Sequence, residues 1–519
     1  MAHDFRHDPH TAVAETAQGR VRGFFYDGVS IFKGIPYARA ERFHAPCPVE
    51  PWEGELDATS FGYACPLLDM PKPAGELLVP HRYWIMEEDC LNLNIWTPGC
   101  DGKKRPVLVW LHGGGYEAGS AIEQIAYEGE NMSRRGNVVV VSLNHRLNIL
   151  GYFDLSAFGE EYANSGNAGM DDIIAALRWV RENIAAFGGD PKNVTLFGQS
   201  GGGGKITTLL QMPAADGLFQ KGINMSGVIG PMLADAEGNG EELAYAMMKE
   251  LGVSTVKEME KVPYRALADA YLKVRPALEK AGKYVGGRPH PNAFYAGDPS
   301  IHGFRKESGS VALLVGSVYG EFAAFAPLAY DRNHMSDAQG EQTVRRAIGD
   351  EAADRLLPLF EKAYPERNPV DLLTLDYLVR PYLKEYVKLR SALCPATWSY
   401  LFNLDLPLNG GTVPWHCADI PYVFGNTELV ATAQEEGVTE RLESEIFHCV
   451  IAFARTGNPN HPGIVYWPAC TPESEPTLVV DKATGVRVDY DEELIRVLAG
   501  TMREAMERNK LRQEGQIQH

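Results

Sequence analysis

The sequence lacks the features that mark membrane, nucleic-acid-binding and metal-binding proteins. Its longest apolar runs, such as residues 107–111 and 138–141, are far too short to span a bilayer. Its 49 lysines and arginines are outnumbered by 68 aspartates and glutamates, and a net charge of −19 does not suit a polyanionic partner. The 8 cysteines include no CxxC pair, and the chain has neither an HExxH motif nor a carboxylate-rich ion loop. We therefore expect no membrane or nucleic-acid partner, no metal and no cofactor.

The chain also lacks the usual signs of export and of division into domains. Residues 1–11 carry His and Asp where a signal peptide has a basic start and an apolar stretch. The chain as given is therefore expected to be cytoplasmic, and secretion of a processed form stays open. No internal repeat, low-complexity tract or long charged linker interrupts the sequence. We expect one domain over residues 1–519.

What the sequence does contain is an alternation of short β-rich runs and helical stretches. Apolar and polar residues alternate over 91–95, as in a half-buried strand, whereas 107–111 and 138–143 are continuously apolar, as in strands buried on both faces. Further strand candidates are residues 194–197, 313–315 and 398–402. Residues 168–186 place their apolar side chains on one helical face. The alternation predicts an α/β fold with a mostly parallel sheet and helices on both faces.

Two long segments carry helical patterns without strand signals. They span approximately residues 234–281 and 336–393. We interpret them as helical insertions packed over the sheet, where the cap or gorge wall of a binding site would lie.

A strand directly precedes Gly198-Gln199-Ser200-Gly201-Gly202, and a helix-compatible stretch follows. This is the G-x-S-x-G motif in the strand–turn–helix context that makes it a nucleophile site. Glycines are needed there because side chains would collide on so sharp a turn. The nearby Gly-Gly-Lys is not a phosphate loop, because Gln199 occupies the required upstream glycine position and Ile206 follows Lys205. Ser200 is therefore the predicted nucleophile.

A second glycine cluster, His112-Gly113-Gly114-Gly115-Tyr116, follows the run 107–111. Consecutive glycines leave backbone N–H groups unobstructed, as in the HGGG loop of lipases and esterases, and the N–H after the nucleophile completes an oxyanion hole. A dinucleotide-binding fingerprint is the competing interpretation. It is disfavoured because the next strand ends at Asn144 and His145, without an acidic residue for a ribose.

The acid and base of a triad would follow the serine along the chain. Glu321 lies just beyond the strand candidate 313–315, at the carboxyl edge where active-site groups gather, and His416 lies in a loop after 398–402. Pattern alone leaves both assignments open, since His448 and several acidic residues compete.

Long, ordered motifs make the chain similar to the type-B carboxylesterases, the cholinesterase-like family that includes bacterial para-nitrobenzyl-esterase-like enzymes. The motifs are GRVRG at 19–23, FKGIPYA at 32–38, EDCLNLNIWTP at 88–98, FGGDPKNVTLFGQSGG at 187–202 and HCADIPYVFG at 416–425. The resemblance covers nearly the whole chain and implies the α/β-hydrolase fold. It implies a triad of Ser200, Glu321 and His416, and oxyanion donors at Gly114, Gly115 and Gly201. It further implies that Ser226 supports the triad from behind.

Several positions depart from the family pattern. Gln199 replaces a glutamate and so removes a charge beside the nucleophile, while Gly201 replaces an alanine and keeps its N–H. Cys417 stands where glycine is usual; we expect it to act as a small buried apolar filler, and a role in tuning access beside His416 is the alternative. Cys65 and Cys90 match positions that form a disulfide in secreted relatives, a bond not expected in a reducing cytoplasm.

These residues predict a carboxylic ester hydrolase that acts through a Ser-Glu-His triad and an acyl-enzyme. Its partner would be a small-molecule ester, and the chain would be a monomer or homodimer. An amidase, carbamate hydrolase or thioesterase would use the same triad and is the alternative. A more remote alternative is a non-catalytic cholinesterase-like binding protein, although such proteins typically lose the serine or histidine that this chain keeps.

Overall fold

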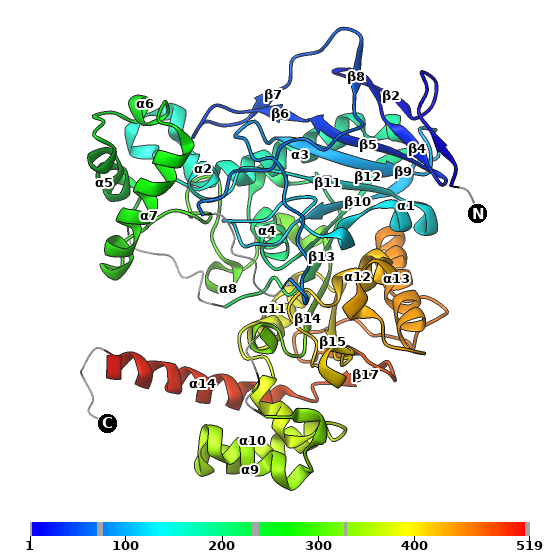
Figure 1. Ribbon diagram of the computed structural model, residues 1–519, viewed down its shortest axis with the longest axis vertical. Coiled ribbons are helices and arrows are strands. Elements are labelled where there is room, and N and C mark those ends of the chain that lie inside the picture. The colour runs from blue at the N-terminus through cyan, green and yellow to red at the C-terminus, as the bar shows by residue number, and fades with distance from the viewer. Residues whose placement is uncertain (1–2, 70–75, 231–237, 326–327, 329, 514–519) are drawn as a thin grey trace.

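A twisted sheet runs through the centre of the protein (Figure 1). The structure, a computed structural model, describes residues 3–69, 76–230, 238–325, 328 and 330–513. In spatial order the 12 strands of the sheet are β1 (Phe5–Arg6), β4 (Phe24–Tyr26), β5 (Val29–Pro36), β9 (Asn92–Thr97), β11 (Val139–Leu143), β10 (Arg105–Leu111), β12 (Gly189–Gln199), β13 (Lys221–Met225), β14 (Ala312–Val318), β15 (Thr397–Phe402), β16 (Pro476–Val480) and β17 (Gly485–Val488). Strands β10 to β16 pair in parallel, and antiparallel strands flank them at both edges.

Two small sheets lie beside the N-terminal edge. One contains β2 (Val13–Thr16), β3 (Gly19–Arg22) and β8 (Glu55–Asp57), and the other contains β6 (Ala38–Arg39) and β7 (Cys47–Pro48). The α-helices are α1 (Glu130–Gly136), α2 (Asn148–Gly151), α3 (Ala168–Asn183), α4 (Gly201–Leu210), α5 (Glu241–Leu251), α6 (Val256–Met259), α7 (Tyr264–Lys280), α8 (Pro299–His302), α9 (Asp337–Ile348), α10 (Asp350–Ala363), α11 (Arg380–Leu393), α12 (Ile420–Phe424), α13 (Thr439–Thr456) and α14 (Glu492–Gln513). None of these helices, in the part of the chain described, is both long and apolar enough to cross a membrane.

The period-two geometry of the strands sends alternate side chains into two different cores. Val107 and Val109 of β10 join the core that includes the apolar residues of α3 and α4. Leu108 and Trp110 of the same strand join the core that includes those of α12 and α13. The continuously apolar run is thus explained by burial on both faces, and the predicted parallel sheet with helices on both sides is present.

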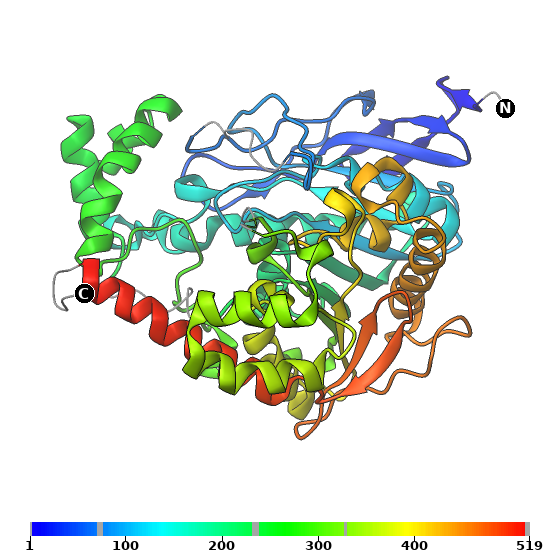
Figure 2. The same cartoon turned by 60° about the horizontal axis from the view of Figure 1, so that its bottom comes forward.

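The two segments predicted to be helical insertions contain helices of different kinds. Helices α5 to α7 lie within 234–281 and stand together at one side of the sheet, while residues 234–237 lie outside the described part. In both views α9 and α10 lie beside the C-terminal helix α14, with which they share a third, smaller core (Figures 1 and 2). Helix α11 instead packs on β14 and β15, as a crossover helix between parallel strands does. The division of the chain into a single domain with insertions stays a prediction.

The expectation of a half-buried strand at 91–95 is wrong. All 6 residues of β9 are buried, because β5 and β11 flank this strand and both of its faces are covered. Its asparagines are satisfied internally: the Asn94 amide donates to Ser142 Oγ at 3.1 Å, and its oxygen accepts from the Gly34 backbone N–H at 3.0 Å. Buried asparagines that have hydrogen-bond partners therefore produced the same apolar–polar alternation in the sequence as a strand with one exposed face.

Strand β13 went unpredicted because Lys221 and Asn224 interrupt its apolar pattern. Both are buried and hydrogen-bonded, Lys221 Nζ to Asn193 Oδ1 at 2.5 Å and Asn224 Nδ2 to the Gly203 carbonyl at 3.1 Å. Cys65 and Cys90, the family's disulfide positions, are buried free thiols. A hydrogen bond of the Cys90 thiol to Cys65, together with burial, raises the pKa of the Cys90 thiol well above its ordinary value.

Candidate active site

Ser200 occupies the turn between β12, which ends at Gln199, and α4, which begins at Gly201. Its backbone has φ 55° and ψ −124°, a conformation that costs a non-glycine residue about 1–3 kcal/mol. The flanking glycine is sterically required, because a Cβ on Gly202 would lie 1.9 Å from the Leu111 carbonyl oxygen. The sequence thus holds the predicted nucleophile on a strained and tightly packed turn.

The glycine loop that follows β10 lies against this turn. Gly114 and Gly115 have φ values of 82° and 62°, which favour glycine, and a Cβ on Gly201 would lie 2.2 Å from the Gly115 carbonyl oxygen. All three glycines, together with Ser200, line one cavity of about 520 Å³. The predicted oxyanion-hole residues are therefore brought together beside the predicted nucleophile.

Glu321 and His416 are in direct contact although 95 residues separate them. His416 Nδ1 lies 2.5 Å from Glu321 Oε2, and the His416 backbone N–H donates to the Glu321 carbonyl oxygen at 3.1 Å. Glu321 is fully buried and His416 is 6% exposed. A carboxylate at Nδ1 fixes the tautomer that carries its proton there, which leaves Nε2 as the acceptor.

Ser226 holds the other oxygen of this carboxylate. Its hydroxyl donates to Glu321 Oε1 at 2.6 Å, and the Val318 backbone N–H donates to the same oxygen at 2.9 Å. Ser226 directly follows β13, so the strand that went unpredicted is the one that positions it. Each oxygen of the buried carboxylate thus has a donor, as a buried charge requires.

The second ring nitrogen of His416, Nε2, is contacted by the side chain of Gln199, the residue before the predicted nucleophile. Gln199 Nε2 lies 3.1 Å from His416 Nε2, and the Cys417 thiol donates to Gln199 Oε1 at 3.2 Å. Among the described residues, no hydrogen bond joins Ser200 Oγ to His416. Cys417 is therefore not simply the apolar filler that the sequence predicted, because its polar S–H lies between the imidazole loop and the elbow.

Three further groups at the site were not predicted from the sequence. The ring of Phe322 lies against the His416 ring with centroids 4.2 Å apart. Asp376 and Asp419 are buried near Glu321, and burial together with the Glu321 charge raises the pKa of Asp376 to about 7. Burial likewise raises the pKa of Asp419 to about 6. Phe322, as the neighbour of Glu321, and Asp419, inside the motif at 416–425, carried a positional signal, whereas Asp376 carried none.

Lys205 lies behind the glycine loop rather than at a phosphate site. This fully buried residue of α4 donates from Nζ to the His112 carbonyl oxygen at 2.9 Å. Burial lowers the pKa of Lys205 to about 7, an effect that the charge of Glu123 opposes. A buried lysine bound to the loop's own backbone is unavailable to a nucleotide, which agrees with the rejection of the phosphate-loop interpretation.

The competing residues take structural roles. The ring of His448 on α13 bonds to the Ser444 carbonyl oxygen of its own helix at 2.7 Å. Asn144 is buried, donates to the Tyr63 carbonyl oxygen and accepts from the Ala121 N–H. Within the described ranges, no group of three or more His, Cys, Asp or Glu side chains is arranged to hold a metal ion. Of the acidic residues left open by pattern, and within the described part of the chain, Glu321 is the one whose carboxylate bonds to the His416 ring.

Comparison with known proteins places this site in a family. The model of the carboxylesterase family matches residues 10–497. The para-nitrobenzyl esterase of Bacillus subtilis (strain 168) is 34% identical over 506 residues, which cover 93% of this chain and 97% of that protein. The phenmedipham hydrolase of Pseudarthrobacter oxydans is 30% identical over 487 residues, covering 90% of this chain and 94% of that protein.

Solved structures agree with the sequence relatives. An esterase from Clostridium hathewayi, described as able to hydrolyse aliphatic aromatic polyesters, superposes with a TM-score of 0.94 at 47% identity and covers 96% of this chain and 100% of its own. A para-nitrobenzyl esterase structure gives a TM-score of 0.74 at 31% identity, with 94% and 99% covered. The predicted α/β-hydrolase fold and the enzyme class, a serine carboxylesterase, are confirmed. The chain belongs to the carboxylesterase family.

Proposed function

We propose that the protein hydrolyses carboxylic esters through a triad of Ser200, Glu321 and His416. The observation that carries the proposal is the contact of the buried Glu321 carboxylate with His416 Nδ1. The other ring nitrogen of His416, Nε2, faces Gln199 of the nucleophile elbow. A carboxylate at that position holds the imidazole in the tautomer that can accept a proton and stabilises the imidazolium that forms. Ser226 keeps the carboxylate in place.

The reaction runs in two halves. His416 Nε2 takes the proton of Ser200 Oγ as that oxygen attacks the ester carbonyl carbon. The negative charge that develops on the carbonyl oxygen is received by the backbone N–H groups of Gly114, Gly115 and Gly201. The bond to the alcohol oxygen then breaks, and the alcohol leaves with the proton from His416. Water attacks the acyl-enzyme by the same steps, releasing the acid and restoring Ser200.

The cavity beside Ser200 fits a substrate that is larger than a minimal ester. Its volume is about 520 Å³, and its wall combines apolar side chains, such as Ile229 and Val285, with the partly exposed Arg275. The relatives named for para-nitrobenzyl esters and for aliphatic aromatic polyesters point to aromatic ester substrates. We propose a small-molecule ester with one bulky or aromatic group.

The deciding experiment is the turnover of a p-nitrophenyl ester by Ser200→Ala. We expect turnover to fall by about 10⁶-fold, as when the nucleophile of a serine hydrolase is removed. Ser156→Ala, an exposed serine on the surface, should keep full activity and serves as the matched control. Turnover by Ser200→Ala at the wild-type rate would refute the mechanism, and inactivity of the wild-type enzyme towards every substrate would favour the non-catalytic alternative.

A panel of matched substrates separates ester hydrolysis from the other uses of the same triad. An ester, an amide and a thioester with the same acyl chain and the same carbon skeleton in the leaving group, and a carbamate with that leaving-group skeleton, would be compared by kcat/KM. The carbamate is included because one relative is named a phenmedipham hydrolase. We expect the ester to be preferred, and a preference for any other member would replace the substrate class while keeping the triad.

A further inference from the structure

Two departures from the family pattern, Gln199 and Cys417, touch each other and the imidazole. They are separated by 218 residues, yet the Cys417 thiol donates to Gln199 Oε1 at 3.2 Å. The amide nitrogen of the same side chain lies 3.1 Å from His416 Nε2. A chain of two hydrogen bonds therefore ends on the nitrogen that must accept the proton of Ser200.

The polarity of this chain is fixed at both ends. Because His416 Nδ1 donates to Glu321, its Nε2 offers a lone pair and needs a donor, which only the NH₂ end of the Gln199 amide supplies. Burial, with smaller contributions from Asp419 and other carboxylates, raises the pKa of the Cys417 thiol well above its ordinary value, against a smaller lowering effect of a side-chain hydrogen bond with Gln124. The thiol therefore keeps its proton and acts as a donor, so it turns the oxygen end of the amide towards itself.

The backbone at Cys417 gives independent support. Its φ is 82°, in the left-handed region that favours the glycine usual at this position. A side chain kept at a strained backbone position beside an active site points to a role for that side chain. Here the side chain is the thiol that bonds to Gln199.

We propose that Gln199 and Cys417 form a positioning pair, in which the thiol orients the amide so that its N–H holds the lone pair of His416 Nε2 in the free enzyme. The proposal rests on the proposed function, since it assumes His416 as the base. When an ester binds, Ser200 Oγ takes the place of the amide at Nε2. No covalent bond is made or broken by the pair.

The pair should set the low-pH limit of the enzyme. An amide N–H at Nε2 favours the neutral imidazole and opposes a proton there, whereas the glutamate of the family pattern would favour the imidazolium. The other groups that face His416 are the Glu321 carboxylate, the Asp419 carboxyl and the uncharged ring of Phe322. Because these groups stay in place when Gln199 or Cys417 is changed, any shift of the pH profile reports on the pair.

The experiment measures kcat/KM against pH for a p-nitrophenyl ester, with active sites counted by the acyl-enzyme burst. The variants are Gln199→Glu, Cys417→Ala and Cys417→Ser, with the buried Cys470→Ala, which lies outside this contact, as control. The pH of half-maximal kcat/KM reports the free enzyme. We expect Gln199→Glu to raise it by on the order of one to two units, since a carboxylate would replace a donor.

The two Cys417 variants isolate the thiol donor. Cys417→Ala leaves the amide free to turn its oxygen to Nε2. We therefore expect the pH of half-maximal kcat/KM to rise by about half a unit, which is less than the rise expected for Gln199→Glu. Cys417→Ser keeps a donor on the same strained backbone and should restore the wild-type midpoint, as should Cys470→Ala. A merely structural role would lower stability in all Cys417 variants without moving the midpoint.

The proposal is overturned if Cys417→Ala and Cys417→Ser share one midpoint, or if Gln199→Glu leaves the midpoint in place. If either result were found while the Ser200→Ala variant was inactive, the positioning pair would be refuted and the proposed triad would not be affected. If Gln199→Glu does not fold, the Cys417 pair of variants still decides the matter. Full turnover by Ser200→Ala would remove the proposed function and this inference together.

Discussion

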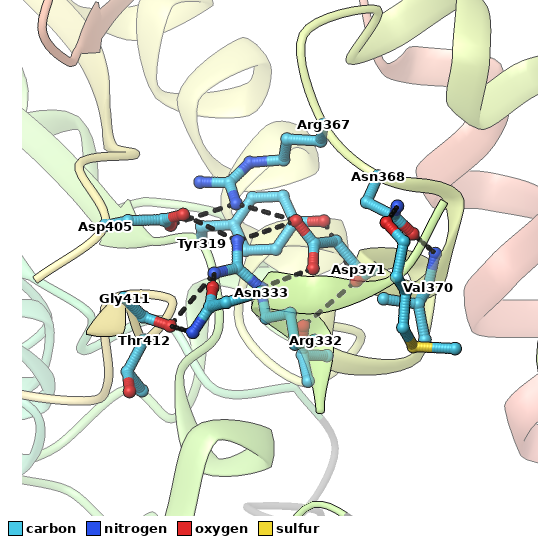
Figure 3. Close-up of polar contacts among 12 residues, drawn as sticks. Tyr319, Arg332, Asn333, Arg367, Asn368, Val370, Asp371, Asp405, Gly411 and Thr412 are labelled. Carbon is cyan, nitrogen blue, oxygen red and sulfur yellow. Dashed lines mark hydrogen bonds and ion pairs between the residues drawn. The ribbon is translucent and has the colours of Figure 1, made fainter. Parts of the chain in front are cut away.

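Two polar clusters share the loop that follows β14, and they differ in how their charges are used. Tyr319 packs under an arginine–aspartate cluster formed by Arg332, Arg367, Asp371 and Asp405 (Figure 3). Two residues further on, Glu321 belongs to the proposed triad. In Figure 3 both guanidinium groups reach both carboxylates, and the contacts measure 2.5–3.2 Å.

The two clusters differ in whether every charged group has a partner of opposite charge. In the arginine–aspartate cluster, where Asp371 is buried and its partners are partly exposed, two cations meet two anions, so each charge is paired, which is the arrangement expected of a structural element. The triad cluster contains the carboxyls of Glu321, Asp376 and Asp419 close together, and the carboxylate of Glu321 faces an imidazole, which is neutral at rest in the proposed mechanism. The unbalanced cluster keeps a capacity to stabilise positive charge, and that capacity is used only when His416 becomes protonated. Substitutions in the first cluster should therefore cost stability, and those in the second should cost rate.

Among substitutions in the two clusters, the largest expected effect is on rate, from Glu321→Gln. Val318 N–H would bind the new amide oxygen, so the amide NH₂ would face His416 Nδ1 and select the wrong tautomer. We expect kcat to fall by about 10³–10⁴-fold with little change in KM. Glu366→Gln, at a partly exposed pair with Arg487, is the control and should keep full activity. A fall of less than tenfold would show that Glu321 is not the orienting acid.

The matching change in the other cluster, Arg367→Met, should lower stability instead. It removes a cation that is 5% exposed in its side chain and faces Asp371, Asp405 and the ring of Tyr319. We expect the free energy of unfolding in urea to drop by about 3–5 kcal/mol, while kcat per active site stays near the wild-type value. The exposed pair of Arg345 with Asp354 supplies the control, since Arg345→Met should cost less than about 1 kcal/mol. If Arg367→Met lost no more unfolding free energy than Arg345→Met, the arginine–aspartate cluster would not be the stabilising element that the comparison requires.

Local sequence was enough to indicate those parts of the site that are each contained in a single strand-to-turn segment. Ser200 and the glycine loop follow buried strands directly, so strand, turn and glycine pattern together indicated them. Glu321 and His416 lie 95 residues apart, and only family resemblance selected them among several candidates. Their roles, like those of the glycines, stay predictions until variants are measured.

What local pattern could not predict are the contacts made by buried polar side chains. Cys417 reaches Gln199 across 218 residues, and such contacts depend on how loops from different strands meet. For the same reason Lys221 concealed β13, and Asn94 made β9 look half-exposed. Apolar periodicity predicts which side chains are buried, but it does not predict the partner of a buried donor.

Gly201→Ala tests how tightly the proposed oxyanion loop is fitted, by restoring the residue that the family usually has. A Cβ there would lie 2.2 Å from the Gly115 carbonyl oxygen, so the loop must shift. We expect kcat to fall by about 10²–10³-fold, comparable to the loss of one oxyanion donor. Gly102→Ala meets no atom within 4 Å and should have no effect on activity. Wild-type activity in Gly201→Ala would mean that the loop adapts without losing its function.

The smallest expected effect concerns the excess of carboxyls in the triad cluster and appears as a pH dependence of stability. Burial raises the pKa of Asp419 to about 6, against the lowering effect of the Tyr400 hydroxyl, and the charge of Glu321 adds to the rise. The Oδ1 atom of Asp419 has no hydrogen-bond partner among the described residues, so its charged form is poorly supported. Because the folded pKa exceeds the unfolded value of 3.8, the folded state prefers the protonated carboxyl. This contribution to stability is complete below about pH 4 and is lost as pH rises through 6.

Asp419→Asn isolates that loss, because its amide stays neutral at every pH. We expect the free energy of unfolding of the variant to gain about 2–3 kcal/mol on the wild type between pH 4 and pH 7, measured by urea denaturation at each pH. Asp489→Asn, at a carboxyl that bonds to Ser474 and Glu475 on the opposite part of the sheet, provides the reference for general charge effects. If wild type and Asp419→Asn changed in parallel with pH, the triad cluster would be balanced like the arginine–aspartate cluster, and the contrast between the two would not rest on unpaired charge.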